Sequence, residues 1–180
     1  DVGTRDFWSG AIPQGAAFDI GPHEAAVAAT YTVGYHANGA TSGTAPASQT
    51  KTHDVALTLA TNSGSLARTG YAFAGWNTAA NGTGTSYAVG ASYTANAAVT
   101  LYAKWTPSTY AVTYNANGAT SGTAPASQTK THNVALTLAT NSGSLARTGY
   151  AFAGWNTSAN GSGTSYAVGA SYTANAAVTL

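Results

Sequence analysis

Side chains suited to acid–base, nucleophilic or metal chemistry are scarce in this chain. Its 180 residues include five Asp or Glu, four His and no Cys. Asp54 is the sole carboxylate side chain beyond residue 30. Catalysis by paired carboxylates needs two acids, and a thiolate metal site or a disulfide needs cysteine. The composition therefore predicts that the protein is not an enzyme and has no catalytic residues, metal ligands or cofactor.

His53 and Asp54 are the nearest approach to a catalytic pair, since a serine could complete a nucleophilic triad with them. Both fall in a segment with strand-like alternation, where neighbouring side chains point to opposite faces of a sheet. We therefore expect the imidazole and the carboxylate to point away from each other.

Two copies of one unit make up most of the chain. Residues 31–101 align with residues 110–180 without a gap at a spacing of 79 residues, and 65 of the 71 aligned positions are identical. Every mismatch exchanges small or polar groups, at Thr32/Ala111, Gly34/Thr113, His36/Asn115, Asp54/Asn133, Ala79/Ser158 and Thr83/Ser162. Because no aromatic or large aliphatic residue changes, we expect both copies to share one fold.

The second copy has no acid at all, because Asn133 stands where the first copy has Asp54. A triad therefore cannot be a property of both copies. The same holds for an intramolecular amide bond between Lys and Asn side chains, a cross-link that needs a nearby acid. Asp54 could serve only the first copy, so the sequence argues against such a cross-link as a shared feature of the pair.

Alternating apolar and polar residues predict short strands separated by turns, and hence a mostly β fold. Tyr31, Val33 and Tyr35 should face inward, as should Val99, Leu101, Ala103 and Trp105. Further strands are expected over Thr50–Ala60, with Val55, Leu57 and Leu59 inward, over Tyr71–Trp76, and over Tyr87–Thr94 with an interruption at Gly90. A short helical turn fits the segment Ser63–Arg68, but no long amphipathic helix is present.

The repeats set the expected domain boundaries. Residues 1–30 match neither copy and are interpreted as an N-terminal extension or the tail of a preceding domain, with a short helix over Ala25–Ala29. Repeat 1 spans residues 31–105, a Pro-containing linker spans 106–109, and repeat 2 spans 110–180. Repeat 2 stops at Leu180 within its last strand, so we expect the chain to be a fragment of a longer array.

Three motifs in this order resemble the Listeria–Bacteroides repeat, which is related to the internalin B-repeat. They are Gly70-Tyr71-Ala72-Phe73-Ala74-Gly75-Trp76, Val99-Thr100-Leu101-Tyr102-Ala103-Lys104-Trp105 and Tyr114-Asn115-Ala116-Asn117-Gly118. The resemblance covers both repeats and implies an α+β, β-grasp-like unit in tandem. It also implies a bacterial protein that is secreted or attached to the cell wall, and it brings no catalytic residues. Ala40 and Ala119 stand where the family usually has a second glycine after Asn-Gly.

Charge and hydrophobicity exclude two classes of partner. Only 6% of residues are charged, against roughly 25% in ordinary soluble domains. Single cations spread along the chain do not form the basic stripe that nucleic-acid binding uses. No segment approaches the roughly 20 consecutive apolar residues of a membrane helix, so no membrane span is expected here. An export signal would lie upstream or would already have been removed.

Three functions remain open from the sequence. The first is a stalk or spacer in an extracellular or cell-surface adhesin of a bacterium, whose partners are neighbouring repeats. The second is a subunit of an extracellular filament that assembles by strand addition, with residues 1–30 able to supply the strand. The third is a module that binds a host or cell-surface glycan or protein by stacking on Trp76 and Trp155, although tryptophan at strand spacing usually packs in a core.

Overall fold

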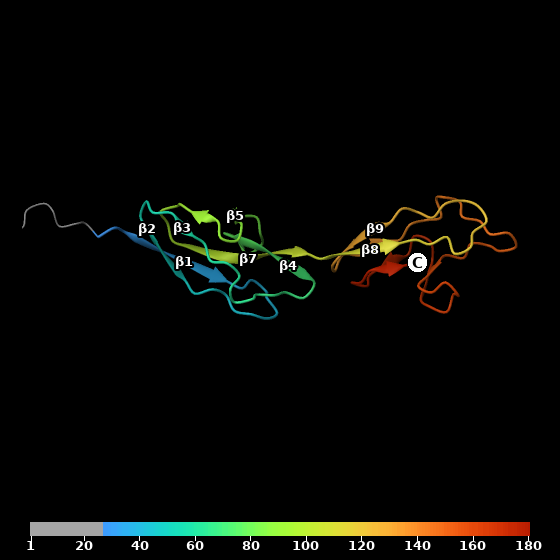
Figure 1. Cartoon of the computed structure of the whole chain (residues 1–180), viewed down its shortest axis with the longest axis horizontal. Coiled ribbons are helices and arrows are strands. Elements are labelled where there is room, and N and C mark those ends of the chain that lie inside the picture. The colour runs from blue at the N-terminus through green and yellow to red at the C-terminus, as the bar shows by residue number, and fades with distance from the viewer. Residues whose placement is uncertain (1–26) are drawn as a thin grey trace, which may run out of the picture.

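The structure is a computed structural model that describes residues 27–180. These residues form two units that follow one another along the long axis of the molecule (Figure 1). Repeat 1 contains β1 (Thr30–His36), β2 (Gln49–Thr52), β3 (Leu57–Thr58), β4 (Tyr71–Asn77), β5 (Ser86–Tyr87), β6 (Ser92–Tyr93) and β7 (Val99–Pro107). Repeat 2 contains β8 (Thr109–Thr113), β9 (Gln128–Thr131), β10 (Leu136–Thr137), β11 (Trp155–Asn156), β12 (Ser165–Tyr166), β13 (Ser171–Tyr172) and β14 (Val178–Thr179).

Repeat 1 is built on a five-stranded sheet in the order β2-β1-β7-β4-β5. The central pair, β1 and β7, is parallel, with Tyr35 opposite Leu101, and the other neighbours are antiparallel. A second small sheet pairs β3 with β6. The strand β7 therefore joins both halves of the main sheet, because it pairs with β1 on one side and with β4 on the other.

A bulge in β4 brings two aromatic residues to the same face. The register with β7 shifts between Phe73 and Trp76, and Gly75 has φ of 105° in the bulge. A β-carbon at Gly75 would collide with the carbonyl oxygen of Tyr87. In a regular strand, residues three apart face opposite sides of the sheet. The extra residue of the bulge shifts the alternation by one, so that Phe73 and Trp76 face the same side. The two rings meet edge to face with centroids 5.1 Å apart.

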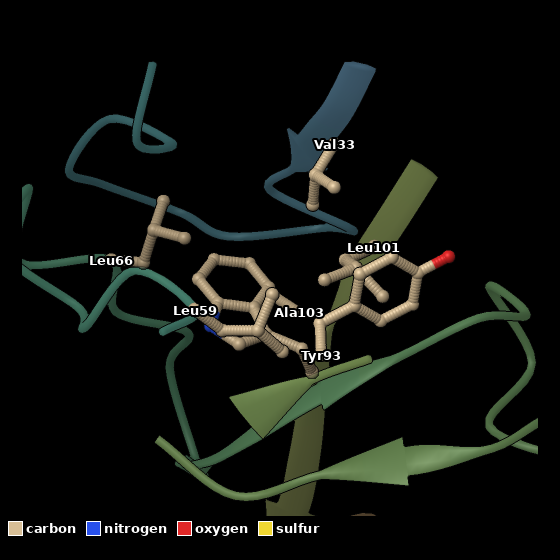
Figure 2. Close-up of a cluster of buried hydrophobic side chains, with 7 residues drawn as sticks. Val33, Leu59, Leu66, Tyr93, Leu101 and Ala103 are labelled. Carbon is tan, nitrogen blue, oxygen red and sulfur yellow. The ribbon is translucent and has the colours of Figure 1, made fainter. Parts of the chain in front are cut away.

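Repeat 1 has its own hydrophobic core, to which β1, β4, β6 and β7 contribute side chains (Figure 2). The fully buried members are Val33, Leu59, Leu66, Trp76, Tyr93, Leu101 and Ala103. This confirms the inward prediction for Val33, Leu101 and Ala103, while Tyr35, Val99 and Trp105 are half-buried at the edge of the core. Tyr31 is also half-buried but is not one of the residues packed against this core.

Repeat 2 repeats this core with its own residues, Val112, Tyr114, Leu138, Leu145, Trp155, Tyr172 and Leu180. Its sheet is less complete, because β14 pairs with β8 but does not reach β11, which pairs only with β12. In repeat 1 the second half of β7 makes that connection. The described fold is thus mostly β, in two repeat units with separate cores.

The predicted strand over Thr50–Ala60 is wrong, because the structure breaks it into β2 and β3. Asp54 has φ of 56° in a turn between them, and Asn133 has φ of 57° at the same place in repeat 2. Val55, predicted to face inward, is 58% exposed. Asp and Asn tolerate the left-handed backbone conformation, so a turn forms here although the apolar residues alternate as in a strand.

No helix occurs among residues 27–180, so the α+β, β-grasp-like form is not seen in the described part of the chain. The predicted helical turn at Ser63–Arg68 is replaced by a side-chain-stabilised turn. The Oδ1 atom of Asn62 accepts the N–H of Leu66 at 2.7 Å, and Ser65 has φ of 52°. Such local bonds from Asn compete with helix formation. Residues 27–29 of the helix expected over Ala25–Ala29 form no helix, and the first two residues of that segment lie outside the described part of the chain.

Candidate functional sites

The connection between the repeats is bonded to both of them. The linker predicted at 106–109 falls almost entirely within β7 and β8, which leaves Ser108 alone between the two strands. The N–H of Ser108 donates to the carbonyl of Gly70 at 2.9 Å, and its carbonyl accepts the N–H of His132 at 2.9 Å. Ser108 thus ties a residue of each repeat to the connection, which limits rotation about it.

The imidazole of His132 fills the junction between the repeats. Its ring stands edge-on to Tyr71 of repeat 1 with centroids 5.3 Å apart, and Nδ1 lies 3.0 Å from the hydroxyl of Tyr110. The guanidinium of Arg68 covers the Tyr71 ring at 4.2 Å. Gly70 has φ of 77°, and a β-carbon there would overlap the imidazole. We define these five residues, together with Ser108, as the junction.

The junction joins an Arg–Tyr pair of repeat 1 to a Tyr–His pair of repeat 2, and each repeat contains both kinds of pair. At the start of repeat 1, the Tyr31 hydroxyl lies 2.9 Å from Nδ1 of His53, as in the Tyr110–His132 pair. In repeat 2, Arg147 covers the ring of Tyr150 at 4.3 Å, as in the Arg68–Tyr71 pair. Tyr150 is 69% exposed. Every repeat therefore has the pairs from which a junction of this kind with a neighbouring repeat can form.

Repeat 2 also carries an open groove of about 600 Å³. Its apolar lining includes Tyr150, Phe152, Trp155 and Leu180. In repeat 1 the second half of β7 runs beside β4, so that Trp105 pairs with Phe73 and their rings meet at 5.6 Å. Phe152, the counterpart of Phe73, is 38% exposed. The groove therefore has the position and the lining of a site for an extended strand.

Trp76 and Trp155, the predicted ligand-stacking residues, are buried in the two cores at 0% and 3% exposure. Their indole Nε1 atoms donate to the carbonyls of Ala60 and Ala139, each at 2.8 Å. The structure does not bring the two rings together, because each belongs to a different core. Stacking on a ligand needs an exposed ring face, and neither indole offers one in this structure.

The expectation that His53 and Asp54 diverge is wrong. Nε2 of His53 lies 3.4 Å from Oδ2 of Asp54, with both side chains substantially exposed at 47% and 79%. The positive φ of Asp54 ends the strand before it and turns its carboxylate back toward the imidazole. Across residues 27–180, no three His, Asp or Glu side chains gather as metal ligands.

Lys51 and Lys130 are among the single cations spread along the sequence, and in the structure both are fully buried. Lys51 lies opposite Tyr31 in the β1–β2 pair and shares its face of the sheet. Nζ of Lys51 donates to the carbonyl of Thr52 at 2.7 Å and to Oδ1 of Asn96 at 3.0 Å. The burial of Lys51 could have been predicted from its pairing across the strands with Tyr31, an aromatic residue that was predicted to face inward.

Three tyrosine hydroxyls have altered acidity. Burial raises the pKa of Tyr93 and Tyr172, with a smaller contribution from the neighbouring Tyr87 and Tyr166. Burial likewise raises the pKa of Tyr35, and a bond from the backbone N–H of Ala60 opposes the shift. These hydroxyls are therefore held neutral and contribute hydrogen bonds, such as the one from Tyr93 to the Ala97 carbonyl at 3.0 Å.

In residues 27–180, no helix has the length and apolar character needed to cross a membrane.

Comparison with known proteins supplies the family. The profile of the Listeria-Bacteroides repeat domain matches residues 31–104 and 110–180. A protein of Evansella cellulosilytica named "Putative Gly-rich membrane protein" is 34% identical over 144 residues, covering 77% of this chain but 16% of its own length. A second protein of that organism, named "Putative membrane protein", is 39% identical over 74 residues, covering 41% of the chain and 11% of its own length. No solved structure shows significant similarity. The chain belongs to the Listeria-Bacteroides repeat family and contains two tandem copies of its repeat.

Proposed function

We propose that this chain is a stalk or spacer segment of an adhesive bacterial protein that is secreted or attached to the cell surface. The observation that carries the proposal is the junction, in which Ser108 and His132 tie repeat 2 to Gly70 of repeat 1. A spacer holds a distal domain at a distance only if its units keep a defined angle to one another. The role is mechanical, with no enzyme activity.

Two further observations support the spacer. Both matched relatives are several times longer than this chain, as expected if the repeats are one segment of a larger surface protein. The repeats also carry few charges, so neighbouring stalks would repel one another little when packed side by side.

The proposal is tested by the distribution of distances between spin labels in the two repeats. The chain has no native cysteine, so labels on Thr58→Cys and Thr137→Cys, exposed positions of β3 and β10, report only the intended pair. We expect one narrow distribution, which broadens when Gly70→Ala displaces His132. The matched control is Gly149→Ala, because Gly149 has a similar φ of 81° but nothing within 4 Å of a β-carbon. A broad distribution before any substitution at Gly70 contradicts the spacer.

A second candidate is a subunit of an extracellular filament, in which the groove of repeat 2 takes a strand from another chain in place of a continuation of its own chain past Leu180. Tyr150 and Phe152 are exposed there, and β11 has a partner on one side only. An open edge of this kind can accept a strand from another chain. The expectation that the N-terminal extension donates the strand concerns residues that are largely outside the described part. Sedimentation over a wide concentration range, with electron microscopy, tests assembly: a monomer at every concentration and no fibres excludes the filament.

A further inference from the structure

The buried amine of Lys51 lies against one side-chain amide. Lys51 is 0% exposed, and both hydrogen-bond acceptors of its Nζ are neutral oxygens: the Thr52 carbonyl at 2.7 Å and Oδ1 of Asn96 at 3.0 Å. Asn96 lies in the turn that leads into β7, on the far side of β1 from β2. A buried nucleophilic nitrogen is thus held against the carbonyl of a half-buried amide.

Asp54 holds the same amide from its other side. Its backbone N–H donates to Oδ1 of Asn96 at 2.9 Å, and its carboxylate Oδ1 accepts Nδ2 of Asn96 at 2.6 Å. The carbonyl oxygen of Asn96 therefore has two donors, and its nitrogen touches a carboxylate. When Nζ of Lys51 attacks the carbonyl carbon, the backbone N–H of Asp54 remains on the oxygen and stabilises the charge that develops there. The carboxylate of Asp54 can carry a proton to the leaving nitrogen.

Repeat 2 contains the same arrangement without the acid. Nζ of Lys130 donates to Oδ1 of Asn175 at 3.1 Å, and the N–H of Asn133 donates to the same oxygen at 2.8 Å. Nδ2 of Asn175 then meets Oδ1 of the Asn133 amide at 2.8 Å, where repeat 1 has a carboxylate. An amide cannot take up and release a proton as a carboxylate does.

We propose that Lys51 and Asn96 form an intramolecular amide bond in repeat 1, with Asp54 as the proton-transfer group, and that the matching residues of repeat 2 stay unlinked. The neutral Nζ attacks Cγ of Asn96, since a lysine amine is nucleophilic only in that form. Asp54 takes the proton that the attacking nitrogen loses and delivers it to Nδ2. The Cγ–Nδ2 bond breaks and ammonia leaves, so an amine and a primary amide become a secondary amide and ammonia, with no change of oxidation state.

The bond would close the chain between residues 51 and 96, so that the segment between them could not extend under a pulling force. It connects β2, the edge of the main sheet, to the turn before β7, across the intervening β1. Separation of β2 from the sheet would then require a covalent bond to break. This inference stands apart from the spacer proposal, because it concerns chemistry inside one repeat and is tested without reference to the junction.

The test is the intact mass of the folded chain. We expect a mass lower than that of the sequence by one ammonia molecule, about 17 Da. Asp54→Asn should restore the full mass, and it should fold because it gives repeat 1 the residue that repeat 2 has at this position. In the converse variant, Asn133→Asp, a second ammonia should be lost. An unmodified mass in the folded wild-type chain overturns the proposal, as does an ammonia loss that persists in Asp54→Asn.

Peptide mapping assigns the loss to the correct residues. Trypsin does not cut after a lysine whose amine is acylated, so cleavage after Lys51 should fail and peptide 6–68 should remain joined to peptide 69–104. A cyclic imide at an Asn-Gly sequence, such as Asn81-Gly82, also releases ammonia but leaves cleavage after Lys51 intact. Finding the loss there, with free Lys51, overturns the proposal.

Discussion

The imidazole of His132 occupies the space that a β-carbon at Gly70 would need. The His132 ring of repeat 2 can therefore pack against the backbone of repeat 1 only because position 70 is a glycine. The backbone of Ser108 bonds to both residues, because its N–H donates to Gly70 and its carbonyl accepts the N–H of His132. This relationship makes the angle between the repeats a structural property of the chain, and it leads to the first prediction.

Gly70→Ala should destabilise the chain more than Gly149→Ala does. Both glycines have a positive φ, so each substitution carries a similar backbone cost of about 1–2 kcal/mol. The methyl at position 70 also displaces His132, which adds about 1–3 kcal/mol by analogy with overpacking in a core. Urea unfolding of the two variants measures the difference, and equal free energies would contradict the contact.

Leu59→Ala should destabilise repeat 1 and leave repeat 2 folded. Leu59 is 1% exposed in the core of repeat 1, and its counterpart Leu138 is 2% exposed in the other core. Truncating a buried leucine costs about 2–5 kcal/mol through lost burial and the remaining cavity. Amide hydrogen exchange read separately for each repeat checks the result, with the exposed Val55→Ala as control. Loss of protection in both repeats would indicate a shared core.

Alkaline pH should destabilise both repeats through Tyr93 and Tyr172. Because burial raises the pKa of each hydroxyl above 10.0, the unfolded chain releases these protons at lower pH than the folded chain. The stabilising contribution is complete below pH 10.0 and is lost as pH rises through the folded pKa. Urea unfolding at neutral pH and above pH 10.0 measures the loss.

The double variant Tyr93→Phe, Tyr172→Phe is the control for the alkaline transition. It should lose less stability between the two pH values, although each lost hydrogen bond lowers its stability at neutral pH by about 0.5–1.5 kcal/mol. An equal alkaline loss in the variant and the wild type would assign the effect to other groups.

Appending the sequence of Tyr102–Pro107 after Leu180 should stabilise repeat 2. In repeat 1 this segment pairs with β4, with Ala103 opposite Trp76 and Trp105 opposite Phe73. The appended strand should fill the groove and cover Phe152, and burial of one large apolar side chain contributes about 1.5–3 kcal/mol. The control is the same extension with Trp105 replaced by Ser. No gain in urea unfolding over that control would contradict a strand site.

Strand prediction succeeded where a buried face alternates without a break. In β1 and β7 the large residues recur at every second position, so Val33, Leu101 and Ala103 were placed correctly. The turn at Asp54 was not predicted, because Val55 continues the alternation of apolar residues expected of a strand. The exchange of Asp54 for Asn133 was the available signal, since both residues tolerate a positive φ.

The candidate sites were less predictable, because they depend on contacts between distant residues. The burial of Lys51 follows from its position opposite Tyr31, which requires the strand pairing to be known. The fit of His132 against Gly70 joins two repeats, and no periodicity within one repeat encodes it. The tryptophans lie in the core, as their strand spacing favoured, because the bulge at Gly75 places Trp76 on the inner face.

The rigid junction is tested most directly by residual dipolar couplings of the backbone N–H bonds in weakly aligned protein. Couplings from residues 31–105 and from residues 110–180 each define an alignment tensor. If Ser108, Gly70 and His132 hold the repeats as the structure shows, the two tensors have the same magnitude and orientation in the frame of the structure. Tensors of clearly different magnitude would show independent motion of the repeats and contradict the spacer.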